Sequence, residues 1–427
     1  MSSRELPCPF PGWAPFSAEY ARYFVGRARE SRIVADSLLA RRISVLYGAS
    51  GAGKTSLIRA GLTRALDERS RWPHEPIVCS AWAHGASACL RSAFEAVVEP
   101  TSEQQSLSAL LGRGAARFEG RLLLVFDQFE ELFSLPGALD AEFVDAIATA
   151  GPKVKVLVSM REDALAELER LDRDIPGIFE HLIPVRRLSE TAGREAIAEP
   201  VELWNETAAR KVALEPALID AVIAGSTVEG PDRTEVHTTR LQLVMTRLWE
   251  DSERSAETVR TLRLEAFERL GGVDGIVASH VETALEAYST RDRDRIDAMF
   301  SALVTPTGAK VPLTAADLGF YADLPEAEAE RIADGLTHGV RLLEPVGDAR
   351  YQLAHDALAA PISEWQRRWG DRRNKRQEWR RLFTVMLFVA ALLLAATGTG
   401  LLHPLELGTV DARFALWVSR KGWRARW

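Results

Sequence analysis

Residues 43–66 read ISVLYGASGAGKTSLIRAGLTRAL and decide the fold class of this chain. An apolar run typical of a buried strand is followed by Gly48–Thr55, which match the pattern G-x-x-x-x-G-K-[ST]. The residues after this motif have the periodicity of a helix. The order of strand, glycine-rich loop and helix predicts a P-loop. The alternative is a glycine loop that binds no ligand.

A P-loop binds the phosphates of a nucleotide. Its glycines let backbone N–H groups turn toward the phosphates, and the helix N-terminus adds positive potential. Lys54 would reach the β and γ phosphates, and the Thr55 hydroxyl would ligate Mg²⁺. We therefore expect ATP or ADP and Mg²⁺ as ligands, with the nucleotide bound by Gly48, Ser50, Gly51, Gly53, Lys54, Thr55 and Ser56.

Strand-like runs alternate with helical periodicity along the first part of the chain. The runs are 43–47, 76–80, 122–127 and 154–159, and the segments between them are long enough for crossover helices. This pattern predicts a parallel α/β sheet in residues 1–187.

Acidic residues follow the third run, LLLVFDQFEELF at 122–133. Asp127 would hold Mg²⁺ from the end of its strand, and Glu130 or Glu131 would orient an attacking water. The next run ends at Arg161, which could sense the γ phosphate, because ligands of open α/β sheets bind at the carboxyl ends of strands. The alternative for Arg161 is a surface ion pair with Glu162 or Asp163.

Composition limits the class of protein. The chain has 427 residues, enough for two or three domains, and its net charge of -7 argues against a surface that coats nucleic acid. Cys8, Cys79 and Cys89 form no C-x-x-C pair, so the sequence indicates neither a disulfide framework nor a zinc site. The N-terminal residues contain no apolar run of signal-peptide length, which favours the cytosol.

Two further domains are expected after the sheet. Residues 188–289 have helical periodicity, clearest in LQLVMTRLWE at 241–250. Residues 290–366 predict helices followed by apolar runs at 341–345 and 350–353, with a hairpin turn at Gly347–Asp348, as in a winged helix.

Residues 382–402, LFTVMLFVAALLLAATGTGLL, contain no charge and predict a transmembrane helix. A buried helix of a globular domain is the alternative. The basic residues at 367–381 outnumber those in the tail, 403–427, so we expect a single-pass protein of the cytoplasmic membrane with its NTPase domain inside. The membrane would be a partner through 382–402.

The motifs together resemble the STAND class of signalling NTPases, and specifically the bacterial novel STAND NTPase 1 group, over about residues 7–368. CPFPGWAPFSAEYARYFVGRARE at 8–30, GASGAGKTSLIRAGL at 48–62, LLLVFDQFEELF and VSMREDAL at 158–165 are similar to the family's motifs in the same order. The resemblance implies that Gly26 and Arg27 lie by the adenine. It also makes Arg161 a sensor arginine.

RYQLAHDAL at 350–358 resembles the winged-helix segment in which a histidine meets the ADP β phosphate, which implies that role for His355. Packing in the core is the alternative. The chain departs from the family at 237–240, where HTTR replaces a usual proline, and in lacking a repeat sensor. HPLELGTVDARFALW at 403–417 faintly resembles the start of CHASE2 sensory domains, and a tail lying on the membrane is the alternative.

The resemblance implies a switch in which ADP holds the domains together and ATP releases them to form a homo-oligomer or to meet an unknown protein effector, with slow hydrolysis resetting it. One alternative is an AAA-like ATPase acting on DNA, although PEAEAERIADGLTHG at 325–339 is too acidic for phosphate contacts. Another is a nucleotide-regulated scaffold that does not hydrolyse ATP.

Overall fold

The computed structural model describes residues 8–398 except 69–75, 83, 99–104, 119–121, 136, 230–233, 255–258, 305–309, 347–349 and 356–357. The chain forms two compact units, Met1–Trp365 and Gln366–Trp427. The predicted boundaries at 187 and 289 both fall inside the first unit and stay predictions.

A parallel sheet forms the first part of the first unit. Its strands are β1 (Ile43–Gly48), β2 (Ile77–Cys79), β3 (Leu122–Phe126), β4 (Val154–Arg161) and β5 (Leu182–Pro184), in the order β2-β3-β4-β1-β5. All neighbouring pairs are parallel. The four predicted strands and their parallel arrangement are confirmed, whereas β5 is an addition that the sequence pattern did not indicate.

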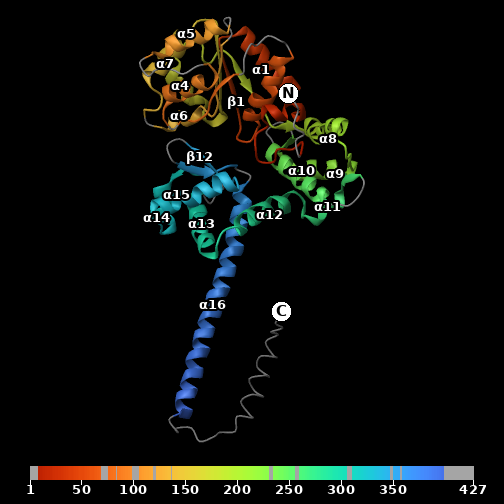
Figure 1. Ribbon diagram of the computed structural model, residues 1–427, viewed down its shortest axis with the longest axis vertical. Helices are drawn as coiled ribbons and strands as arrows, with labels where there is room; N and C mark the ends of the chain where they lie inside the picture. Colours follow the sequence, from red (N-terminus) through yellow and green to blue (C-terminus); the bar gives the residue numbers. More distant parts are fainter. Residues whose placement is uncertain are drawn as a thin grey trace. The chain divides into compact units, whose positions relative to one another are not determined.

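Helices cover both faces of this sheet (Figure 1). Successive side chains of a strand point to opposite faces, so Leu122, Leu124 and Phe126 join one core cluster, and Leu123 and Val125 join the other. The first cluster includes α4 (Ala86–Val97), α5 (Leu107–Arg117) and α7 (Ala141–Thr149). The second includes α1 (Ala28–Ala40) and the helix after the P-loop, which consists of α2 (Lys54–Ser56), η2 (Leu57–Leu62) and α3 (Thr63–Asp67).

This strand order brings the predicted motifs together. Because β4 lies between β1 and β3, the carboxyl ends of these three strands meet at one edge of the sheet. The P-loop, Asp127 and Arg161 follow or end these strands. Two short helices complete the edge, α6 (Glu130–Ser134) and η3 (Glu162–Leu171).

A helical part follows the sheet. Its helices are α8 (Glu190–Thr207), α9 (Pro216–Ser226), α10 (Thr238–Glu253), α11 (Leu264–Arg269) and α12 (Gly272–Glu286), and the short strands between them are β6 (Leu188–Ser189), β7 (Val212–Leu214), β8 (Thr227–Glu229), β9 (Thr234–Val236) and β10 (Arg260–Leu262). Phe10, Phe16 and Tyr23 from the N-terminal segment, which includes η1 (Ala18–Tyr23), pack into the core of this part. The start of the chain is therefore built into the helical part.

The last part of the first unit has the predicted order of helices and hairpin. It comprises α13 (Thr290–Leu303), β11 (Leu313–Thr314), α14 (Ala315–Ala322), α15 (Glu326–Asp334), η4 (Gly335–Gly339), β12 (Leu343–Val346) and β13 (Arg350–Leu353). The strands β11, β13 and β12 form an antiparallel sheet, so the predicted hairpin of the two apolar runs is confirmed. Its predicted turn at Gly347–Asp348 lies outside the described residues.

The predicted transmembrane helix is wrong. Residues 382–398 belong to α16 (Ala359–Gly398), and among the described helices none is both long and apolar enough to cross a membrane. The apolar part of α16 directly follows turns that contain Arg376, Glu378 and Arg381, and the described part of the helix extends to Gly398. The predicted single-pass location in the cytoplasmic membrane is therefore wrong as well. The membrane as a partner is not tested. Residues 399–402 and the tail 403–427 lie outside the described residues.

Candidate functional site

The loop between β1 and α2 has the backbone conformation that its glycines permit. Gly51 and Gly53 have φ angles of 71° and 92°, in the left-handed region that other residues rarely adopt. A Cβ atom on Gly48 would lie 2.2 Å from the carbonyl oxygen of Val185, so this position admits no side chain. The helix begins at Lys54, which places Thr55 and Ser56 in its first turn.

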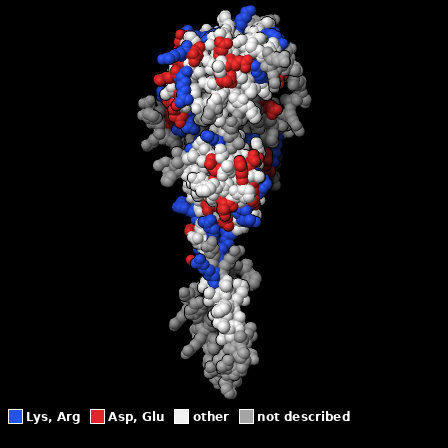
Figure 2. Space-filling view, turned by 90° about the vertical axis from the view of Figure 1, so that its left-hand side faces the viewer, with Lys and Arg blue, Asp and Glu red and all other residues white. Residues whose placement is uncertain are grey.

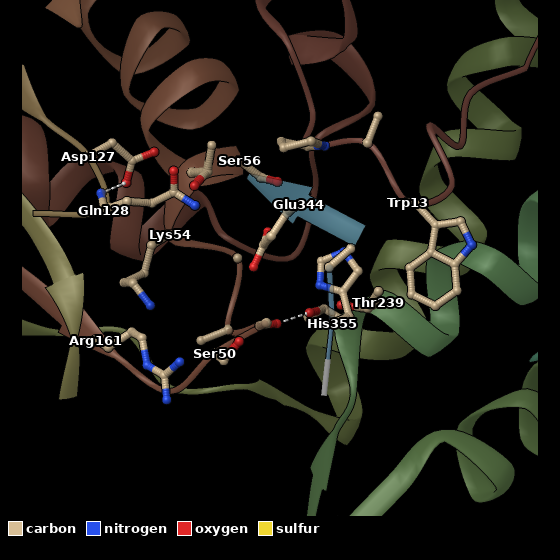
Figure 3. A pocket seen from close by; sticks show the side chains of 18 of the residues that line it. Trp13, Ser50, Lys54, Ser56, Asp127, Gln128, Arg161, Thr239, Glu344 and His355 are labelled. Atoms are coloured by element: carbon tan, nitrogen blue, oxygen red, sulfur yellow. Dashed lines mark hydrogen bonds between the residues drawn. The ribbon is translucent and has the colours of Figure 1, made fainter. Parts of the chain in front are cut away.

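Lys54 lies folded back on the loop. Its Nζ donates hydrogen bonds to the carbonyl oxygens of Gly48 at 2.8 Å and Ala49 at 3.1 Å. Burial lowers the pKa of Lys54, and the negative charges of Glu130 and Asp127 oppose this shift. Lys54 and Asp127 thus lie on the same side of the pocket (Figure 3).

Asp127 is buried, with 2% of its surface exposed, and is fixed by its neighbours. Its Oδ1 accepts hydrogen bonds from Ser159 Oγ at 2.7 Å and from the Gln128 backbone N–H at 3.1 Å. Its carbonyl oxygen accepts a bond from Trp82 Nε1 at 2.9 Å. Gln128 has a φ of 56°, so the chain turns sharply after the acid.

Glu130 and Arg161 meet through the backbone. Arg161 N donates to Glu130 Oε2 at 3.2 Å, and burial is the largest cause of a raised pKa of Glu130. The Arg161 side chain instead makes a two-pronged ion pair with Asp163, at 3.0 and 2.6 Å, which lowers the pKa of that carboxyl. The alternative reading of Arg161 as half of an ion pair therefore matches the geometry, although the side chain also lines the site.

A pocket of about 660 Å³ lies above this edge, and its walls come from every part of the first unit. The sheet part contributes the predicted residues Arg27, Ser50, Gly51, Gly53, Lys54, Thr55, Ser56, Asp127, Glu130, Glu131 and Arg161. The N-terminal segment contributes 12–16, and α10 contributes 238–239 and 241–242. The winged-helix-like part contributes Lys310, Glu344, Gln352 and His355.

The start of α10 holds the P-loop. Thr238 Oγ1 donates a hydrogen bond to the Gly51 carbonyl oxygen, and Thr239 Oγ1 lies 3.4 Å from the position that a Gly51 Cβ would take. Thr238 and Thr239 belong to the HTTR segment in which the family's usual proline is missing. A threonine hydroxyl makes a contact here that proline cannot make.

His355 lies on the side of the pocket opposite Asp127 and Arg161 (Figure 3). Its ring stacks on Trp13, with ring centres 5.1 Å apart and planes 16° apart. The other neighbour of Trp13 is His280 of α12, at 5.3 Å. Close by, Lys310 Nζ lies 3.4 Å from Glu344 Oε1, which also accepts a bond from Gln352 Nε2 at 2.7 Å.

Gly26 and Arg27 connect the N-terminal segment to the loop. A Cβ on Gly26, whose φ is 78°, would lie 2.6 Å from the Ala192 carbonyl oxygen, so α8 approaches closely. The buried Arg27 guanidinium donates to the carbonyl oxygens of Ala52 at 2.9 Å and Arg186 at 2.6 Å, and burial lowers its pKa. Arg27 lines the pocket, whereas the pocket lining does not include Gly26 or Gly48.

Several pocket residues were not predicted. Trp13, Gln128 and Thr238 lie in longer motifs of the sequence analysis without a role of their own, and Lys310 and Glu344 were not singled out at all. Ser159, which binds Asp127 but does not line the pocket, was not singled out either. Ser159 could have been found, because it lies near the carboxyl end of β4, the strand that pairs with β3. The winged-helix-like part lines the pocket although its residues are more than two hundred positions from the P-loop in the sequence. A local sequence pattern cannot predict such a contact.

The residues fit a nucleotide and Mg²⁺. Carboxylate and hydroxyl oxygens, as on Asp127 and Thr55, are the ligands that Mg²⁺ prefers. At the pocket wall, Gln242 Oε1 and Trp13 Nε1 are buried and have no hydrogen-bond partner among the described residues. Such groups suit a ligand with hydrogen-bonding edges, because an unpaired buried polar atom is costly.

The parallel sheet, the P-loop and the acid at the end of β3 define a nucleotide-binding P-loop NTPase. The sequence profile of the family Novel STAND NTPase 1 matches residues 9–386. The match spans most of the chain, and the chain belongs to this family.

Solved structures with a similar fold include three archaeal proteins. The ORC1 protein of Aeropyrum pernix, in complex with DNA, is 18% identical, with 81% of this chain and 94% of that chain covered and a TM-score of 0.48. The ORC2 protein of Aeropyrum pernix is 16% identical, with coverages of 80% and 94% and a TM-score of 0.46. A Walker-type ATPase of Pyrococcus abyssi is 15% identical, with coverages of 82% and 98% and a TM-score of 0.40. Comparison with curated proteins finds no match.

Proposed function

We propose that the chain binds ATP or ADP with Mg²⁺ in this pocket and works as a nucleotide-dependent switch that hydrolyses ATP slowly. The observation that carries the proposal is the composition of the pocket wall. Lys54, Thr239 and His355 line one cavity although they belong to three different parts of the first unit. A nucleotide bound there would contact all three parts at once, so ADP and ATP would favour different arrangements of them.

The residues of the sheet edge have separate roles in this proposal. Thr55 and Asp127 would hold Mg²⁺, which neutralises phosphate charge when it is bound. Lys54 would leave the carbonyl groups of the loop and bind the β and γ phosphates. Glu130, rather than Glu131, would orient water, because Glu130 is held by the Arg161 backbone N–H and its pKa is raised.

The winged-helix-like part would act on the nucleotide and a protein effector rather than on nucleic acid. The first half of α15 contains Glu326, Glu328 and Glu330, and a helix that contacts DNA phosphates needs basic residues instead. On the face of the first unit in Figure 2, acidic and basic side chains are intermingled. An arrangement of this kind is typical of surfaces that do not coat nucleic acid.

The test measures the size of the full chain by light scattering, with Mg²⁺ and either ADP or a non-hydrolysable ATP analogue. We expect a monomer with ADP and a larger homo-oligomer with the analogue. Lys54→Ala should lower the affinity for both nucleotides about ten- to a hundredfold, because charge-assisted hydrogen bonds contribute roughly 1.5–3 kcal/mol each, and should abolish the size change. The same size with both nucleotides would contradict the switch, and unchanged affinity in Lys54→Ala would contradict the site.

A further inference from the structure

One ion pair of the winged-helix-like part lies at the wall of the pocket. In the antiparallel pairing of β12 and β13, Glu344 stands opposite Gln352. Side chains of a strand alternate between its two faces, so the neighbouring residues Leu343 and Leu353 are buried in the core. Glu344 and Gln352 point the other way and line the pocket, as does Lys310, which precedes β11. The fold thus brings a cation and an anion of one part to the nucleotide site.

The Lys310 side chain is nearly buried, with 7% of its surface exposed, and its charge is balanced by Glu344. Its Nζ lies 3.4 Å from Glu344 Oε1 and donates a hydrogen bond to the Leu353 carbonyl oxygen at 3.3 Å. Both distances exceed the roughly 2.7–3.2 Å of most N–H···O bonds, so these contacts are weak. A buried ammonium group needs anionic partners, and an anion that comes closer can replace Glu344.

A nucleotide phosphate would be such an anion. In the view of Figure 3, the Glu344 side chain projects into the pocket between Lys54 and His355. In the proposed site these two residues bind phosphates, so the phosphate chain would pass close to Glu344. Like charges at short range are unfavourable, whereas Lys310 offers an attraction at the same wall. The two members of the ion pair therefore act on a bound phosphate in opposite directions.

We propose that Lys310 and Glu344 distinguish ATP from ADP. With ADP, Lys310 stays paired with Glu344, and with ATP it leaves Glu344 and binds the γ phosphate. Because Lys310 also holds the Leu353 carbonyl oxygen, the exchange would loosen the end of β13, which directly precedes the segment with His355. The inference rests on the proposed binding of ADP and ATP in this pocket. It adds an attractive and a repulsive element that together set the preference between them.

The test titrates the full chain, in the presence of Mg²⁺, with ADP or with a non-hydrolysable ATP analogue in a calorimeter. Lys310→Met should weaken binding of the analogue about ten- to a hundredfold, because a charge-assisted hydrogen bond is lost, and should change ADP binding by less than about threefold. Glu344→Gln keeps an acceptor for Gln352 but removes the negative charge. It should tighten binding of the analogue about tenfold and change ADP binding by less than about threefold.

A second ion pair provides the matched control. Arg295 and Glu328 are paired in the same part of the chain, and the described lining of the pocket includes neither residue. Arg295→Met and Glu328→Gln should leave the ratio of the two dissociation constants unchanged.

The opposite signs at the two ends of the pair are decisive, because an ion pair that only stabilises the fold responds alike to the loss of either partner. Weaker binding of the analogue in both Lys310→Met and Glu344→Gln, or an unchanged ratio of dissociation constants in Glu344→Gln, would overturn the inference and leave the nucleotide site intact. Failure of the unmodified chain to bind either nucleotide would overturn the proposed function together with the inference. Glu344→Gln decides even if Lys310→Met does not fold.

Discussion

Asp127 and Glu130 are two carboxylates three residues apart in different surroundings. Asp127 accepts two hydrogen bonds on one oxygen. Glu130 accepts one from the Arg161 backbone N–H, yet burial raises its pKa. Two neighbouring acids whose surroundings differ in this way can take different chemical roles. This difference supports the proposal that Asp127 holds the metal and Glu130 orients the water.

The raised pKa of Glu130 predicts how its neutral substitute affects stability. A carboxyl whose folded pKa lies above its unfolded value stabilises the fold below the unfolded pKa, and this contribution is lost as the pH rises through the folded pKa. At neutral pH the charged Glu130 is therefore a cost to the fold. Glu130→Gln should raise the melting temperature at pH 7 and have little effect at a pH well below that of an ordinary glutamate. It should also slow ATP hydrolysis about a hundredfold.

The measurement is thermal unfolding over this pH range, with Glu169→Gln as the control, because Glu169 is exposed and its substitution removes the same charge. A lower melting temperature of Glu130→Gln at neutral pH would show that the Glu130 charge is favourable in the fold. If Glu130→Gln hydrolyses ATP as fast as the unmodified chain, Glu131 rather than Glu130 orients the water.

At the residue scale the sequence predicts the ends of strands well. Asp127 directly follows an apolar run, and Lys54 and Thr55 follow the glycine-rich loop after another, so their place at the sheet edge is a consequence of local pattern. The pairing of Arg161 with Asp163 could not be chosen over a phosphate contact, because both partners are polar and lie two residues apart on the chain. Only side-chain geometry separates these alternatives.

Among the contacts between elements, the one between the winged-helix-like part and the N-terminal segment bears most directly on the proposed switch. Trp13 packs between His280 of α12 and His355 just after β13. Of the two histidines, His355 lines the pocket and His280 does not. The two histidines therefore share a packing partner but differ in access to a nucleotide.

This difference gives a matched pair of variants. His355→Ala should speed the release of ADP about tenfold, since it removes both the packing on Trp13 and the proposed hydrogen bond to phosphate, which is worth about 1.5–3 kcal/mol when one partner is charged. His280→Ala removes packing on Trp13 alone and should change ADP release much less. Stopped-flow measurement with a fluorescent ADP analogue compares the two rates. Equal acceleration in both variants would mean that His355 acts only through packing.

The elements themselves were partly predictable. The runs that contain β1, β2, β3 and β4 and the hairpin of β12 and β13 have clear patterns, whereas the three residues of β5, Leu182–Pro184, give no periodic signal. The uncharged run at 382–402 predicted a transmembrane helix, but in α16 the start of this run continues a helix whose preceding turns are charged. A hydrophobic run alone did not determine where the helix would begin.

For the whole first unit, the central claim is that one nucleotide joins three parts of the chain. The sequence predicts these parts one after another, but it does not predict that Thr239 and Glu344 meet the P-loop at one pocket. That arrangement depends on packing between distant segments. The claim therefore has to be tested on all three walls at once.

Hydrogen–deuterium exchange of the full chain, with and without Mg²⁺ and ADP, is the most direct measurement. The account predicts that ADP slows exchange in the P-loop at 48–56, at the start of α10 at 238–242 and in β13 together, and that Lys54→Ala loses all three effects. Slower exchange confined to residues 48–56 would contradict it, because the nucleotide would then contact the P-loop without joining the other two parts.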